Sequence, residues 1–141
     1  LVIGGIGTSV TILQRKDRPF SCAKQVSEWI FATYPNRSAR VLSGIVDYTM
    51  TPISAYIQEK IYMPNIRSYG NYVIWNTDRK KETNQMQVDH LLKMTVQPNQ
   101  ILLLITNQLK NVDYSGFKLV YDSCQNAVVP SERYIVLERE N

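Results

Sequence analysis

The fold is decided by residues 40–75, which read RVLSGIVDYTMTPISAYIQEKIYMPNIRSYGNYVIW. The apolar run 40–46 is long enough for a buried strand and too short for a typical helix. Thr51, followed directly by a proline, predicts a helix with a threonine cap and a proline in its first turn. The second apolar run, 72–75, predicts another strand. A helix between two apolar strands is a β-α-β unit, whose strands run parallel.

The helix of this unit is predicted from Thr51 to Pro64. Its isoleucines recur every four residues and so share one helical face: Ile53, Ile57 and Ile61. Two further helices have similar apolar stripes. One runs from Pro19 to Thr33, and the other from Thr83 to Thr95. Trp29 lies on the inward stripe of the first of these helices and is predicted to be a core residue.

Three more apolar runs predict strands at 101–105, 117–121 and 134–138. The first run is continuously apolar, which is typical of a central parallel strand covered on both faces. The connection between the last two runs has no helical pattern, which favours an antiparallel pair. The charged end of the last run indicates an edge strand. The order of elements predicts one α/β domain over residues 1–141: a three-layer Rossmann-like sandwich whose sheet is mostly parallel, with an antiparallel C-terminal edge strand.

Residues 1–13 are apolar and uncharged. They are too few to span a bilayer, which needs about 20 residues, and they lack the basic start of a signal peptide. Two interpretations stay open: the first strand of the sheet, or the remnant of a preceding membrane helix. Gly5 and Gly7 do not predict a dinucleotide site, because the third glycine of the G-x-G-x-x-G motif is missing.

The composition excludes few classes of protein. The chain has 141 residues, a net charge of +4 and 44% hydrophobic residues. Its basic residues form small groups beside acids, which argues against a nucleic-acid partner, since such proteins cluster Lys and Arg on one face. The two cysteines, Cys22 and Cys124, are either buried thiols or one disulfide. No spacing of Cys and His fits a zinc site.

Candidate ligand-binding residues follow the first two predicted strands. Ligands of open α/β sheets bind beyond the carboxyl ends of the strands, where the sequence places Asp47, Tyr48 and Thr51 and, after the next strand, Asn76. The helix N-terminus offers N–H donors to an anion, and Tyr48 offers a stacking face for a sugar ring. The alternative is that these four residues only cap turns.

No catalytic residue, metal ligand or cofactor is predicted. The chain contains no P-loop and no G-x-S-x-G elbow. A Ser-His-Asp triad would need the single histidine, His90, which the helical pattern places on an exposed face. An independent enzyme is therefore the weaker hypothesis.

A family resemblance is carried by several short stretches. These are 15–19 with Trp29-Ile30, the strand around Val41, 52–57, 61–64, 72–76 and 132–138. Together they resemble the soluble C-terminal domain that follows the last transmembrane helix in some bacterial polytopic glycosyltransferases of the dolichyl-phosphate-mannose protein mannosyltransferase-like superfamily. Such enzymes move a sugar from a polyprenyl-phosphate carrier to an acceptor on the outer side of the membrane. Their catalytic acids lie between early transmembrane helices, outside this chain.

The resemblance implies a non-catalytic extracytoplasmic (periplasmic) accessory domain of a glycosyltransferase in the cell membrane. It would be attached through an N-terminal transmembrane region and would assist the binding of a polyprenyl-phosphate sugar or a glycan acceptor. Residues 1–13 fit the exit from a membrane helix, whereas the basic residues after them do not favour an outside location. The alternative is a stand-alone soluble Rossmann-like enzyme, or a small-ligand binding protein, in the cytoplasm.

Overall fold

The computed structural model describes residues 18–71, 81–107, 110–123 and 127–140. They form a mixed α/β fold around a six-stranded sheet. Its strands are β1 (Arg40–Gly44), β2 (Ile61–Met63), β3 (Ser68–Gly70), β4 (Ile101–Thr106), β5 (Phe117–Asp122) and β6 (Ile135–Arg139). Its helices are α2 (Ala23–Thr33), α3 (Met50–Ile57) and α4 (Asn84–Lys93), with short 3₁₀ turns at Arg37–Ala39, Asp47–Thr49 and Pro130–Glu132. Two predicted strands, in residues 1–13 and at 72–75, lie outside the described residues.

The sheet has the order β3-β2-β1-β4-β6-β5. Strand β1 runs parallel to β2 and β4, and the other three pairings are antiparallel. The prediction of a mostly parallel sheet is therefore wrong: β2 and β3 are joined by a short turn, and the described residues between β5 and β6 contain no crossover helix, so both pairs are antiparallel. The antiparallel pairing of the last two strands is confirmed. However, β6 lies between β4 and β5, so the edge strand is β5.

Helix α3 ends much earlier than predicted. Its C-cap, Gln58, adopts the left-handed conformation at φ 54° and ψ 38°, which stops the helix after Ile57. Ile61 then begins β2 instead of continuing the helical stripe. The helix also begins at Met50, after a 3₁₀ turn, so Thr51 lies inside it and is not its cap.

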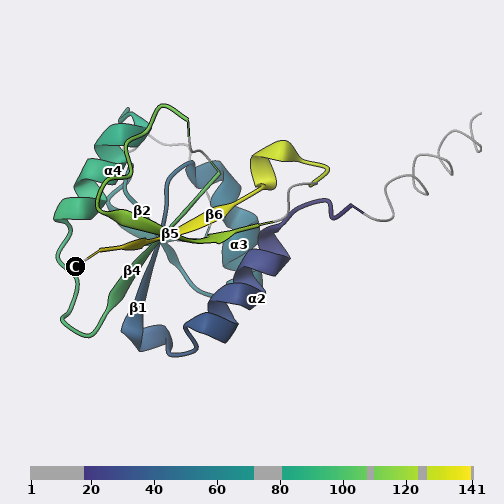
Figure 1. Ribbon diagram of the computed structural model, residues 1–141, viewed down its shortest axis with the longest axis horizontal. Helices are drawn as coiled ribbons and strands as arrows, with labels where there is room; N and C mark the ends of the chain where they lie inside the picture. Colours follow the sequence, from purple (N-terminus) through teal and green to yellow (C-terminus); the bar gives the residue numbers. More distant parts are fainter. Residues whose placement is uncertain (1–17, 72–80, 108–109, 124–126, 141) are drawn as a thin grey trace, which may run out of the picture.

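Helices cover both faces of the sheet: Figure 1 shows α4 on one side and α2 with α3 on the other. Successive side chains of β4 point to opposite faces of the sheet and so pack against different helices. Leu103 and Ile105 join the core cluster of α2 and α3, whereas Leu102 and Leu104 join the cluster of α4. The run 102–105 is buried throughout, as predicted for a central strand.

The apolar stripe of α2 faces the sheet as expected. Val26 and Ile30 are fully buried, and Trp29 packs against the same cluster while remaining partly buried. The indole stacks on Tyr121 of β5, with ring centroids 4.6 Å apart. Trp29 therefore packs at the periphery of the core, beside the edge strand β5, and not at the centre of the core.

Cys22, which immediately precedes α2, is fully buried and disulfide-bonded. Cys124 is the only other cysteine of the chain. The structure thus selects the disulfide from the two alternatives that the sequence left open.

Candidate functional site

The loop after β1 holds Asp47, the first of the predicted ligand-binding residues. Val46 precedes it in the left-handed conformation, at φ 62°, which is unusual for a β-branched residue. The Asp47 side chain is buried, with only 4% of the residue exposed. One carboxylate oxygen accepts a hydrogen bond from the Tyr48 amide (2.8 Å), and the other accepts one from the Asn65 side-chain amide (2.7 Å). Asp47 therefore stabilises its own turn and joins it to the turn after β2.

Two further hydrogen bonds, both made by side-chain hydroxyl groups, hold the rest of this loop. The Thr49 hydroxyl donates to the Val46 carbonyl (2.8 Å), and the Tyr134 hydroxyl donates to the Thr49 carbonyl (2.8 Å). Tyr134 is fully buried, and this burial raises the pKa of its phenol well above the usual range. A neutral, buried phenol thus holds the loop at the carboxyl end of β1.

The remaining predicted site residues have different surroundings. Tyr48 and Thr51 are both exposed, the tyrosine to 54%. They lie three residues apart, Tyr48 in the 3₁₀ turn and Thr51 in the first turn of α3. Asn76 lies outside the described residues. The structure therefore brings three of the four predicted residues to one edge, with the aspartate buried and the other two facing solvent.

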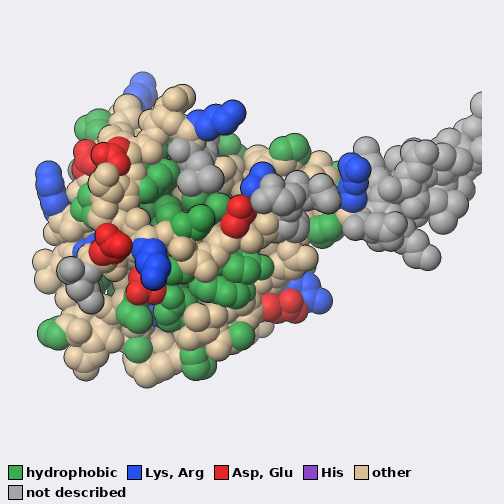
Figure 2. Space-filling model, viewed as in Figure 1, with side chains coloured by type: hydrophobic (Ala, Val, Ile, Leu, Met, Phe, Trp, Pro, Cys, Tyr) green, Lys and Arg blue, Asp and Glu red, His purple; other side chains and the backbone are tan. Residues whose placement is uncertain are grey.

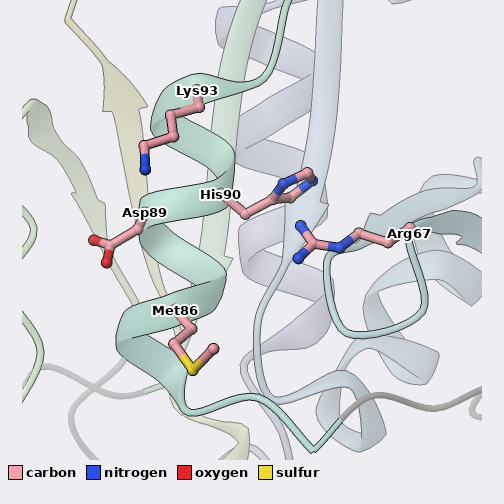
Figure 3. A pocket seen from close by; sticks show the side chains of 5 residues that line it. All are labelled: Arg67, Met86, Asp89, His90 and Lys93. Carbon is pink, nitrogen blue, oxygen red and sulfur yellow. The ribbon is translucent and has the colours of Figure 1, made fainter.

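A pocket that the sequence did not indicate lies between α4 and the turn that joins β2 to β3 (Figure 3). It encloses about 340 Å³ and is lined by Arg67, Met86, Asp89, His90 and Lys93. Figure 3 shows Arg67 and His90 pointing toward one another across it, with the other three side chains along α4. The Arg67 and His90 side chains therefore meet at this place, whereas the Asp89 and Lys93 side chains extend from the other side of α4 in the view of Figure 3.

His90 has a partner beneath the pocket. Its Nε2 atom lies 2.8 Å from the hydroxyl of Tyr62 in β2, and the two rings are stacked, with centroids 6.0 Å apart. The residue is half-buried, so the prediction of an exposed histidine is wrong. The cause is that β2 places a tyrosine under α4. Burial raises the pKa of the Tyr62 phenol, and the nearby Arg67 guanidinium opposes this shift.

Arg67 is held in an unusual way. Its backbone is left-handed, at φ 53°, and its Nη2 atom lies 2.6 Å from a carboxylate oxygen of Glu82. Its Nη1 atom is buried and has no hydrogen-bond partner among the described residues. A guanidinium has five N–H donors in a planar fork, so much of this donor capacity is not used in the ion pair.

The acidic residue of the pocket, Asp89, accepts a hydrogen bond from the Gln85 side chain (2.9 Å). Lys93, one helical turn further on, is exposed. Within the described ranges, no group of three or more His, Cys, Asp and Glu residues could hold a metal ion. The lining of the pocket thus combines acidic and basic side chains with the apolar Met86.

Sequence reasoning missed Asn65 and Arg67 because it placed their segment just after a helix. Both residues follow β2, so the rule that ligands bind beyond strand ends would have selected them had that strand been recognised. The contact between Tyr62 and His90 has no local signal, since 28 residues separate the two along the chain.

Charges of opposite sign are mixed on the surface that Figure 2 presents, where acidic and basic side chains lie beside one another. Of the helices that the structure describes, none is both long and apolar enough to cross a membrane. Neither family models nor curated proteins nor solved structures match this chain.

Proposed function

We propose that this chain is a non-catalytic extracytoplasmic accessory domain of a membrane-bound glycosyltransferase, with a Rossmann-like three-layer fold. The observation that carries the proposal is the buried, disulfide-bonded Cys22. Disulfides persist in the periplasm and other oxidising compartments and are rare in the cytosol. The bond therefore supports an extracytoplasmic location, in agreement with the family resemblance of the sequence.

The loop after β1 supports an accessory role. Asp47 is buried and accepts two hydrogen bonds within the domain, an arrangement that suits a turn-forming residue. Tyr48 and Thr51 face solvent beside it. We assign to them the contact with a glycan acceptor or with the polyprenyl-phosphate sugar, through ring stacking and a hydroxyl hydrogen bond.

The location is tested on the full-length protein in its own membrane. We expect protease to remove the domain from right-side-out vesicles and to spare it in inverted vesicles. Cys22 should resist alkylation until a reductant is added. Protection in right-side-out vesicles, or alkylation without reduction, would contradict the proposal.

The role in binding is tested by Tyr48→Ala in the full-length enzyme, with Tyr56→Ala as a matched control. Both tyrosines are about half exposed, and both lie in or next to α3. We expect Tyr48→Ala to raise KM for the acceptor or the lipid carrier several-fold without changing kcat, because a stacked ring stabilises by about 1 kcal/mol. Equal effects of the two variants would reject the site.

The alternative function is a stand-alone soluble enzyme or small-ligand binding protein, and the pocket beside α4 favours it. Recovery of the protein from the soluble cell fraction with reduced cysteines would support this alternative. The vesicle and alkylation measurements above therefore distinguish the two candidates directly.

A further inference from the structure

We propose that the pocket between α4 and the β2–β3 turn binds a small phosphomonoester that carries hydroxyl groups, such as a sugar phosphate. The pocket is built from residues other than Tyr48 and Thr51. The inference therefore goes beyond the accessory role and does not depend on it.

Basic side chains of the pocket can contact an anion, although two carboxylates balance their charge: Glu82 is paired with Arg67, and Asp89 lies one helical turn from Lys93. Arg67 and Lys93 contribute two positive charges, and His90 adds a third nitrogen-bearing side chain. The one acid in the lining, Asp89, already accepts a hydrogen bond from Gln85. Arginine suits phosphate in particular, because its planar fork can donate two parallel hydrogen bonds to phosphate oxygens.

Arg67 is arranged as a ligand-binding residue rather than as half of an ordinary ion pair. Glu82 holds the guanidinium from one side, at 2.6 Å, and the buried Nη1 atom lacks a partner among the described residues. The left-handed backbone at φ 53° is a strained conformation for a non-glycine residue. Such strain persists where the surroundings enforce it, and it clusters at ligand clamps and active sites.

His90 is oriented for the same task. The Tyr62 hydroxyl, 2.8 Å from Nε2, holds the imidazole ring, and the ring stacks on the phenol. A ring held in this way loses little conformational entropy when it binds a ligand oxygen. Figure 3 shows it aimed toward Arg67, so the two side chains flank one position.

The other lining residues indicate the ester group. Met86 is 52% exposed and offers an apolar surface to a carbon skeleton. The Asp89 carboxylate lies beside it and can accept a hydrogen bond from a hydroxyl group of the ligand. The volume of about 340 Å³ lies at the small end of the range of ligand pockets, which fits one sugar ring with its phosphate.

The test is an NMR titration of the chain with glucose 1-phosphate, glucose and inorganic phosphate. We expect saturable shifts for glucose 1-phosphate at Arg67, His90 and Lys93, weaker binding of phosphate, and no binding of glucose. Lys93→Gln should raise Kd about tenfold, as expected for loss of a charge-assisted hydrogen bond. The matched control is Lys24→Gln, which removes an exposed lysine of α2 that is paired with Glu28. It should leave Kd unchanged.

Three results would overturn the proposal. The first is no saturable shift at about 10 mM ligand, which excludes even millimolar affinity. The second is an equal loss of affinity in the Lys24 and Lys93 variants, which indicates diffuse attraction to a basic protein. The third is sedimentation with phosphatidic acid vesicles that depends on Lys93, without binding of glucose 1-phosphate. That outcome would identify a lipid headgroup as the source of the phosphate.

Discussion

Two arginine–glutamate pairs lie on opposite faces of the sheet, and they differ in how completely the arginine is enclosed. The Arg40 side chain is fully buried. It pairs with Glu59, donates to the Tyr34 carbonyl and lies over the Phe31 ring. The Arg67 side chain is 31% exposed, pairs with Glu82 and lines a pocket.

The two sites show that an arginine–glutamate pair can stabilise the fold in one place and line a pocket in another. Glu59 also binds Arg37, at 3.2 Å, so three charged side chains form one network at the amino end of β1, in which the buried Arg40 Nε atom has no hydrogen-bond partner among the described residues. The pair of Arg67 lies beyond the carboxyl end of β2, where ligands of parallel strands bind. The enclosed pair is therefore structural, and the open pair is available to a ligand.

The largest expected effect is on the enclosed pair. Arg40→Ala should lower the free energy of unfolding by about 3–5 kcal/mol, because it leaves Glu59 without its buried partner. Urea unfolding followed by circular dichroism measures it. The double variant Arg40→Ala/Glu59→Ala should recover part of the loss. If the single variant is as stable as wild type, the two pairs do not differ as described.

Packing on the same face as Arg40 should be the next most sensitive feature. Trp29→Ala removes the ring that stacks on Tyr121 and should cost about 3 kcal/mol, the lower end for a large aromatic residue, because the side chain is only partly buried. Met86→Ala, on the pocket side, is the control and should change stability by less than about 0.5 kcal/mol. Thermal melts of both variants check this order, and an equal loss would refute it.

The open pair should contribute much less to stability. Arg67→Ala should lower the free energy of unfolding by about 1–2 kcal/mol, because solvent screens the 31% exposed guanidinium, although the Glu82 side chain is only 10% exposed and loses its partner. The same variant should abolish binding of glucose 1-phosphate in the NMR titration. Loss of stability as large as that of Arg40→Ala would show that this pair is structural too.

The last expected effect is absent at neutral pH and appears only at high pH, on the enclosed side. Tyr34 donates to Glu138, and burial, with the help of that carboxylate, raises the pKa of the phenol from 10.0 to about 12. Stability from this group is complete below the unfolded pKa and is lost as pH rises from about 10 toward 12, since only the unfolded state has then released the proton. Unfolding measured across this range should show a decline that is shallower in Tyr34→Phe. An unchanged slope would contradict the shifted pKa.

Sequence patterns were sufficient for much of this architecture. The helices α2 and α4 and the strands β1, β4, β5 and β6 follow periodicities that burial of one or both faces imposes. The prediction of a helix through Ile61 was wrong. The isoleucines are spaced every four residues up to Ile61, but the helical backbone ends at Ile57 and Ile61 belongs to β2. The helix ends through the left-handed conformation of Gln58, which a glutamine does not signal. Because the helix was predicted to be too long, neither strand β2 nor the pocket beside the turn after it was predicted.

The position of β6 has a consequence for synthesis. This strand pairs with β4 on one side and with β5 on the other, so among the described residues β5 joins the sheet only through β6. Nascent chains that stop before residue 135 leave β5 without its pairing to β6, and unpaired strand edges promote aggregation. Synthesis of residues 135–139 is therefore the step that brings β5 into the sheet of this domain.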